Sequence, residues 1–160
     1  MRAVAQRVSE ARVEVAGACV ARMGEGILAL VGVAADDGPK DADELARKLC
    51  HLRIFEDAAG RMDRSLLDVG ATLGVVSQFT LLGDTRKGRR PSFSRAARPD
   101  RAAPLVEAVV DAARSEGARI VTGRFGAQMR VSLVNEGPVT LWLDTRRGAD
   151  HAPGNSTGRA

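Results

Sequence analysis

The chain has 160 residues, of which 44% are hydrophobic and 28% are charged, and its formal net charge is +4 at pH 7. This length fits a single domain, which buries roughly two thirds of its unfolded surface in one core. The longest apolar runs, such as Gly26 to Ala35, are far shorter than the ~20 residues of a membrane-crossing helix, and the first residues lack the apolar stretch of a signal peptide. We therefore expect one soluble, cytoplasmic domain with no membrane partner.

The first third of the chain has the pattern of β-strands followed by a helix. Residues 2–15, 18–24 and 26–33 are predicted to be successive strands. Pro39 can begin a helix, because the first turn of a helix tolerates proline. Apolar residues then recur at helical spacing, and these are Ala42, Leu45, Ala46, Leu49, Leu52 and Ile54.

The rest of the chain adds further strands and a second helix. Residues 55–63 resemble a hairpin, and Val75 to Leu82, with the sequence VVSQFTLL, has the length and composition of a buried strand. A helix is expected from about Asp100 to Glu116, before Gly117. Two closing strands, residues 129–134 and 139–143, are expected on either side of a turn. The apolar pattern is lost from Thr145, which predicts a single domain over residues 1–144 and a disordered tail over 145–160.

Histidine and cysteine do not form a recognisable catalytic or metal-binding pattern. His51 lies in the first predicted helix and His151 in the predicted tail, so neither is placed as a general base. Cys19 and Cys50 are expected to be reduced structural thiols, because two cysteines make no disulfide framework and no paired ligand spacing for zinc. We expect neither a metal nor a cofactor.

Two short stretches carry unexplained features. Ser77, Gln78 and Thr80 are polar residues inside the predicted VVSQFTLL strand, where a period of two would put Gln78 and Thr80 on one face. Such atoms need partners, which are either a ligand or neighbouring backbone groups, and the sequence leaves both alternatives open. Gly137-Pro138 is typical of a tight turn, and about one X-Pro bond in twenty is cis.

A basic segment, RKGRR, lies between the two helices. Its cationic residues are Arg86, Lys87, Arg89 and Arg90. Such a cluster can bind the phosphates of an RNA, although a solvated surface loop has the same composition. Aromatic residues make up only 3% of the chain, which leaves few side chains for stacking on bases.

The segments SQFTL (Ser77 to Leu81) and NEGPVT (Asn135 to Thr140) together resemble the paired signature of D-aminoacyl-tRNA deacylases, the D-Tyr-tRNA deacylase family. The resemblance continues in order through RIFED, DTRKGRRPSFS and TGRFGAQM, and it ends near Asp144. It implies a homodimeric α/β protein with a barrel-like, mostly antiparallel β core and two main helices. Its expected reaction is hydrolysis of the ester between a D-amino acid and tRNA, with active sites at the subunit interface and no cofactor.

The resemblance also implies roles for individual residues. Ser77, Gln78 and Thr80 would be catalytic, through main-chain N–H groups as much as side chains, while the ribose 2′-hydroxyl assists water. The Gly137-Pro138 peptide would be cis and reach into the partner's pocket. There its carbonyl groups would bind the α-amino group and reject L-amino acids. Further substrate-binding residues would be Phe79, Phe125 and Met129, Arg7 would brace the Gly-Pro segment, and Arg86, Lys87, Arg89 and Arg90 would bind tRNA.

Because glycine has no side chain for this filter to reject, glycyl-tRNA should also be hydrolysed to some degree. Two other functions stay open. One is a non-catalytic RNA-binding module in which the basic segment is the functional part. The other is a small-ester hydrolase with Ser77 or Thr80 as a covalent nucleophile, which would need a base that the sequence does not visibly supply.

Overall fold

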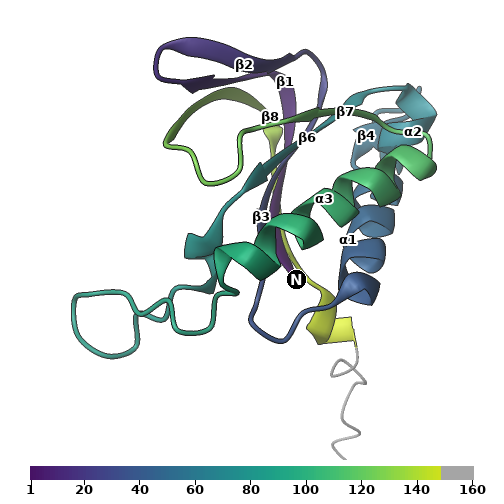
Figure 1. The fold of residues 1–160 in the computed structure, drawn as a ribbon. Coiled ribbons are helices and arrows are strands. Elements are labelled where there is room, and N and C mark those ends of the chain that lie inside the picture. The colour runs from purple at the N-terminus through teal and green to yellow at the C-terminus, as the bar shows by residue number, and fades with distance from the viewer. Residues whose placement is uncertain (149–160) are drawn as a thin grey trace, which may run out of the picture.

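The computed structural model describes residues 1–148 (Figure 1). The strands are β1 (Arg2–Val15), β2 (Ala18–Met23), β3 (Gly26–Gly32), β4 (Phe55–Glu56), β5 (Met62–Arg64), β6 (Thr72–Ser77), β7 (Arg119–Thr122) and β8 (Met129–Asp144). The helices are α1 (Pro39–His51), α2 (Leu66–Val69) and α3 (Pro99–Ser115), and two 3-10 turns are η1 (Phe79–Leu82) and η2 (Thr145–Gly148). The predicted first three strands, the hairpin and both main helices are confirmed close to their expected bounds.

Strand β1 is the centre of the main sheet. Its first half pairs antiparallel with β3 and its second half with β2, while β8 pairs antiparallel with both halves. Strand β6 is parallel to β3, and β7 is parallel to β6. The sheet curls so that β2 and β7 approach each other (Figure 1). This is the barrel-like α/β core that the resemblance implied, with more antiparallel than parallel pairings.

Strand β1 contributes side chains to two separate apolar cores. Ala3 and Ala5 pack on the side of the sheet covered by α1 and α3, whereas Ala11 and Val13 pack inside the curl. Side chains alternate along a regular strand, so odd-numbered residues can change sides only where the pairing is irregular. The pairing with β8 shifts at residues 8–10, which allows one long strand to serve both cores.

The two main helices lie side by side over the outer face of the sheet (Figure 1). Helix α1 has proline in its first turn and buries five of its residues, which are Ala42, Leu45, Ala46, Leu49 and Cys50. It ends at His51, so Ile54, which was assigned to the same helical pattern, is buried outside the helix. Within residues 1–148 the helices are too short or too polar to cross a membrane.

Strand β6 ends at Ser77, earlier than predicted. The N–H of Gln78 donates to the carbonyl of Val31 at 2.7 Å, and the chain then turns into η1. Gly32 permits this close approach, because a Cβ at that position would lie 2.9 Å from the Gln78 carbonyl oxygen. The prediction that Gln78 and Thr80 share one face of a continuous strand is therefore wrong.

Strand β8 continues through the segment that was predicted to be a turn between two strands. Gln6 pairs with Thr140 and Val8 with Asn135, so Arg7 alone lies opposite four residues of β8. These four residues, Glu136 to Val139, form a protruding segment that we call the Gly-Pro loop. The chain does not reverse there, because β1 is long enough to pair with β8 on both sides of the loop. The Gly137-Pro138 peptide is cis, as expected.

The sequence patterns missed two elements. Helix α2 begins after Ser65, whose hydroxyl accepts the Asp68 N–H while the Asp68 carboxylate accepts the Ser65 N–H. This capping box has a recognisable spacing that could have predicted the helix start. Strand β7 has only four residues, and its sequence RIVT is too short for alternation alone to identify it.

The predicted disordered tail begins too early. Thr145 is buried, its N–H donates to the Met1 carbonyl at 3.0 Å, and its hydroxyl donates to Asp41 at 2.7 Å. These contacts attach η2 to the start of α1. The remainder of the predicted tail, residues 149–160, lies outside the described residues.

Candidate active site

A cavity of about 570 Å³ opens where β6 ends, beside the start of α3 and the loop between β7 and β8. Its interior is aliphatic and includes Val31, Val33, Val76 and Val106. Its more accessible wall contains Ser77, Gln78, Phe79, Phe93, Phe125 and Met129. The tertiary structure thus brings five predicted site residues to one cavity, and it adds Phe93, which the sequence patterns did not identify.

The SQFT turn, Ser77 to Thr80, forms the polar part of this wall. Gln78 Nε2 donates to Thr80 Oγ1, and the Leu81 N–H donates to the Gln78 carbonyl at 3.2 Å. Arg2 holds the far end of the turn, since its Nη1 donates to the Leu81 carbonyl at 3.3 Å. The first N–H groups of a helical turn have no acceptor within that turn, so those of Phe79 and Thr80 are suited to bind an anionic oxygen. Thr80 itself is exposed beside the cavity.

Among residues 1–148, the surroundings of the SQFT turn contain no evident base for a hydroxyl nucleophile. Thr80 Oγ1 accepts a hydrogen bond from the side-chain amide of Gln78. This amide nitrogen is a donor, so it cannot remove the proton of the Thr80 hydroxyl. His51 instead contacts Glu116 just beyond the C-terminus of α3, with 2.6 Å between Nε2 and Oε2. The cavity lies near the other end of α3, at Ala102, about 20 Å away along the helix.

Cys19 and Cys50 are both free thiols, of which Cys19 is exposed and Cys50 is buried. Cys50 is buried between α1 and α3, and burial raises the pKa of its thiol to about 11. Its thiolate is therefore scarce at neutral pH, which makes it a poor nucleophile or metal ligand. Among residues 1–148, no group of three or more histidine, cysteine or acidic side chains is arranged to hold a metal ion.

The Gly-Pro loop is supported from below by Arg7. The buried Arg7 side chain donates from Nε to the Glu136 carbonyl at 3.3 Å and from Nη1 to the Ile54 carbonyl at 2.6 Å. Gly137 lies above Arg7, and its backbone φ is +114°. A Cβ at this position would lie 2.8 Å from Arg7 Nη2. Glycine is therefore required at this position by both conformation and space. Pro138 is exposed at the loop's surface.

Asn135 closes the base of the Gly-Pro loop. Its Nδ2 donates to the carbonyl of Arg7 at 2.9 Å and to the carbonyl of Val139 at 3.0 Å, while its Oδ1 accepts the Thr140 hydroxyl at 3.1 Å. One side chain thereby joins both ends of the loop to β1. This explains why asparagine and threonine flank Gly137-Pro138 in the sequence.

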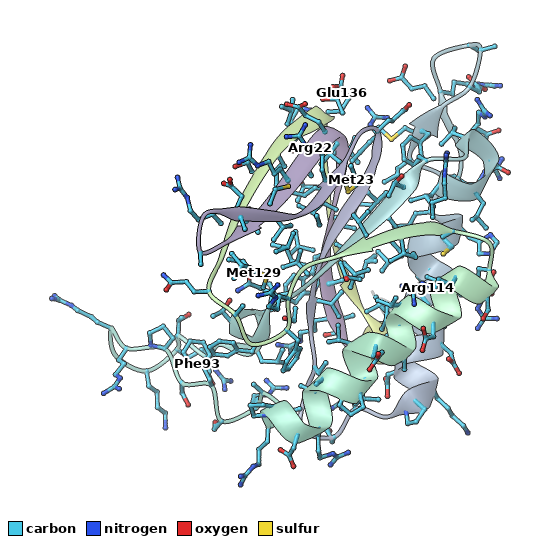
Figure 2. All side chains as sticks on the ribbon, turned by 45° about the horizontal axis from the view of Figure 1, so that its top comes forward. Arg22, Met23, Phe93, Arg114, Met129 and Glu136 are labelled. Atoms are coloured by element: carbon cyan, nitrogen blue, oxygen red, sulfur yellow. The ribbon has the colours of Figure 1, made fainter. Side chains whose placement is uncertain are left out.

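The SQFT turn and the Gly-Pro loop are not brought together within one chain. Ser77 pairs with Val31 on β3, whereas Arg7, beneath the loop, pairs with Ile27 four residues earlier on the same strand. Four residues of a strand span about 13 Å. In Figure 2, Glu136 lies near the top of the view, whereas Phe93, whose ring contacts Phe79 of the SQFT turn, lies at its lower left.

The basic loop, residues 84–92, projects from the body (Figure 1), and Phe93, which follows it directly, lines the cavity. Asp84 and Ser92 close it through two backbone hydrogen bonds of 2.8 and 2.9 Å. Arg86 folds back onto Asp84, and hydrogen bonds from its guanidinium group hold the pKa of the Asp84 carboxyl well below its usual range. Lys87, Arg89 and Arg90 are exposed and form no salt bridge with residues 1–148. All four cations of the loop are thus open to a polyanion, and of these only Arg86 is paired with a carboxylate inside the loop.

Comparison with known proteins gives a consistent match over nearly the whole chain. Residues 4–144 match a family model described as D-Tyr-tRNA(Tyr) deacylase. A D-aminoacyl-tRNA deacylase of Thermomicrobium roseum is 57% identical, with 91% of this chain and 94% of the relative covered. One of Anaeromyxobacter dehalogenans is 58% identical, with 92% and 99% covered.

Solved structures agree with the sequence matches. A structure titled c-Myc DNA Unwinding Element Binding Protein superimposes with a TM-score of 0.84 at 36% identity and covers 90% of this chain and 98% of that one. A probable eukaryotic D-amino acid tRNA deacylase gives a TM-score of 0.79 at 20% identity over 89% and 97% of the two chains, which supports the fold. The fold and the sequence matches together define a hydrolase of the deacylase class. Within this class, the chain belongs to the D-Tyr-tRNA(Tyr) deacylase family.

Proposed function

We propose that the protein hydrolyses the ester that links a D-amino acid to the 3′-terminal adenosine of tRNA, and that it rejects L-aminoacyl-tRNA. Family membership supports an enzyme over the non-catalytic RNA-binding module that the sequence left open. The observation that carries the proposal is the cavity, where the SQFT turn meets an apolar interior beside Phe79, Phe125 and Met129. A substrate bound to tRNA would be met in the cytoplasm.

We infer that the site is shared between the two chains of a homodimer. In one chain the β3 residues that pair with Arg7, beneath the Gly-Pro loop, and with Ser77, at the start of the SQFT turn, are about 13 Å apart along the strand. The ester and the α-amino group of an aminoacyl substrate are only two bonds apart at the same carbon. The loop of a second chain would therefore bind the amino group while the SQFT turn of the first chain binds the ester.

The proposed chemistry relies on the RNA for activation of water. Water adds to the ester carbonyl carbon, the bond to the 3′-oxygen breaks, and the ribose 2′-hydroxyl relays a proton toward the departing 3′-oxygen. The N–H groups of Phe79 and Thr80 would stabilise the negative charge that develops on the carbonyl oxygen. The Thr80 hydroxyl, held by Gln78 Nε2, would position the substrate and not attack it.

Chirality would be selected by the carbonyl groups of Gly137 and Pro138. When the pocket fixes both the amino group and the ester, the two remaining substituents of Cα have fixed directions. The direction that faces the loop has room for a hydrogen atom only, so the side chain of an L-amino acid would collide with the loop. Glycine has no side chain to collide, and we expect slower but measurable hydrolysis of glycyl-tRNA.

The test is a deacylation assay with D-tyrosyl-, L-tyrosyl- and glycyl-tRNA at equal concentrations. We expect hydrolysis in the order D-tyrosyl, glycyl and L-tyrosyl, with the last close to the uncatalysed rate. A parallel D-tyrosyl substrate ends in 2′-deoxyadenosine, for which RNA assistance predicts a much slower reaction. Equal rates with both adenosines, together with covalent labelling of Ser77 or Thr80, would instead support a protein nucleophile.

A further inference from the structure

The phenylalanines of this chain are distributed unevenly. The chain has four phenylalanines and no tyrosine. Phe55 is buried, whereas Phe79, Phe93 and Phe125 are 57%, 38% and 40% exposed and all line the same cavity. Partly exposed aromatic rings gathered at one pocket mark an interaction surface, and RNA-binding proteins use such rings to stack on unpaired bases. Residues 79 and 125 already have a role in the proposed site, but residue 93 does not.

Phe93 occupies a defined position between the basic loop and the cavity. Its ring meets the ring of Phe79 edge-on, with 5.0 Å between the centroids and 70° between the planes. The ring also covers Gly83, where an added Cβ would lie 3.1 Å from Phe93 Cε1. The Ala96 N–H donates to the Phe93 carbonyl at 3.0 Å. These contacts fix the ring at the root of the projecting loop, where Figure 2 labels it.

The order of these features along the chain defines a path for single-stranded RNA. The exposed cations Lys87, Arg89 and Arg90 lie beyond the pair of hydrogen bonds between Asp84 and Ser92, at the tip of the loop. Phe93 follows directly at its root, and the cavity lies behind it. An RNA end whose phosphates contact the tip of the basic loop, and whose last nucleoside enters the cavity, passes the ring of Phe93.

We propose that Phe93 stacks on the base of the nucleotide that precedes the terminal adenosine. This inference rests on the proposed function, because it takes the aminoacylated end of tRNA as the occupant of the cavity. Stacking on an aromatic ring tolerates any base, so the contact adds affinity without demanding a particular nucleotide. Phe93 is then a positioning residue that fixes how far the strand enters, while the SQFT turn contacts the ester.

The inference is tested with two substrates that differ by one nucleotide: 3′-O-D-tyrosyl adenosine and the dinucleotide D-tyrosyl CpA. The wild-type protein should show a higher kcat/KM for the dinucleotide. Phe93→Ala should lower kcat/KM for the dinucleotide about tenfold more than for the adenosine ester, as expected from the loss of one stacked base. Phe93→Tyr keeps the ring and should retain the preference. Met62→Ala, which removes an exposed apolar side chain from β5, is the matched control and should change neither value.

Three results would decide against the inference or against its premise. An equal loss for both substrates in Phe93→Ala would show that the ring acts only through Phe79. A wild-type protein without preference for the dinucleotide would show that no nucleotide binds at this position. If the wild-type protein hydrolysed neither of the two small substrates and also failed to hydrolyse D-tyrosyl-tRNA, this result would instead contradict the proposed function.

Discussion

Arg7 is a charged residue whose side chain is buried beneath the Gly-Pro loop. Its partners are the carbonyl groups of Ile54 and Glu136, and the Glu56 carboxylate lies 3.7 Å away. Because these carbonyl groups would lose their donor, we expect Arg7→Met to lower the free energy of unfolding by about 1–3 kcal/mol. The unsupported loop should also lose its position, so that the preference for D-tyrosyl- over L-tyrosyl-tRNA falls. Urea unfolding and paired deacylation assays measure the two effects.

The matched control for this variant lies on the same strand. Arg12 is exposed and forms an ion pair with Glu14, so Arg12→Met should change the unfolding free energy by no more than about 1 kcal/mol and leave the D-over-L preference intact. Arg7→Lys can keep one of the two hydrogen bonds, and we expect an intermediate result. If Arg7→Met matched the wild type in both measurements, Arg7 would not support the loop.

At the scale of a single element, the basic loop allows a test of whether its exposed cations bind the phosphates of tRNA. Lys87 and Arg89 are free of salt bridges within the described chain, so they can bind phosphates without breaking an internal ion pair. Replacing both with alanine should weaken binding of every aminoacyl-tRNA alike. The log-log dependence of the binding constant on salt should become shallower by up to ~0.9 for each phosphate that the variant no longer neutralises. Binding of tRNA measured from low to moderate salt gives this slope.

A charge-matched control separates a local interaction from a general effect of net charge. Arg53→Ala with Arg61→Ala removes the same formal charge from the segment around β4 and β5, on the opposite side of the molecule in Figure 1. Its salt dependence should equal that of the wild type. Equal slopes for all three proteins would mean that the basic loop is only a solvated surface loop.

At the scale of the whole molecule, the separation of the SQFT turn from the Gly-Pro loop predicts complementation between two inactive variants. Gly137→Ala disables the loop, because its Cβ would lie 2.8 Å from Arg7 Nη2 and its φ is +114°. Gln78→Ala with Thr80→Val disables the turn. Each homodimer should be inactive, but a mixed dimer should contain one intact site formed by the turn of one chain and the loop of the other.

Random mixing of the two variants by refolding together should therefore restore roughly a quarter of the wild-type sites. The measurement is D-tyrosyl-tRNA hydrolysis of the mixture against each variant alone, with the dimeric state followed by light scattering. If both variants are folded and exchange subunits but their mixture stays inactive, the two segments do not share a site across chains.

The sequence by itself determined the elements whose patterns are local. Helical spacing from Ala42 to Leu49 follows from burial of one face of the helix, and it needs no information about distant residues. The paired segments SQFTL and NEGPVT likewise indicated the family without a structure, and the comparisons confirmed it. Short elements such as β7 were missed because four residues contain too little of any period.

The tertiary structure alone decided where these local patterns stop and which residues meet. VVSQFTLL bends after Ser77 because Gly32, distant in sequence, lets the backbone approach β3. Strand β8 passes through its Gly-Pro loop because β1 pairs with it on both sides. Phe93 joins Phe79 at the cavity through the closure of the basic loop, a contact with no periodic signal. Such outcomes depend on packing between segments that are distant in the sequence, and that packing leaves no periodic signal in any one of them.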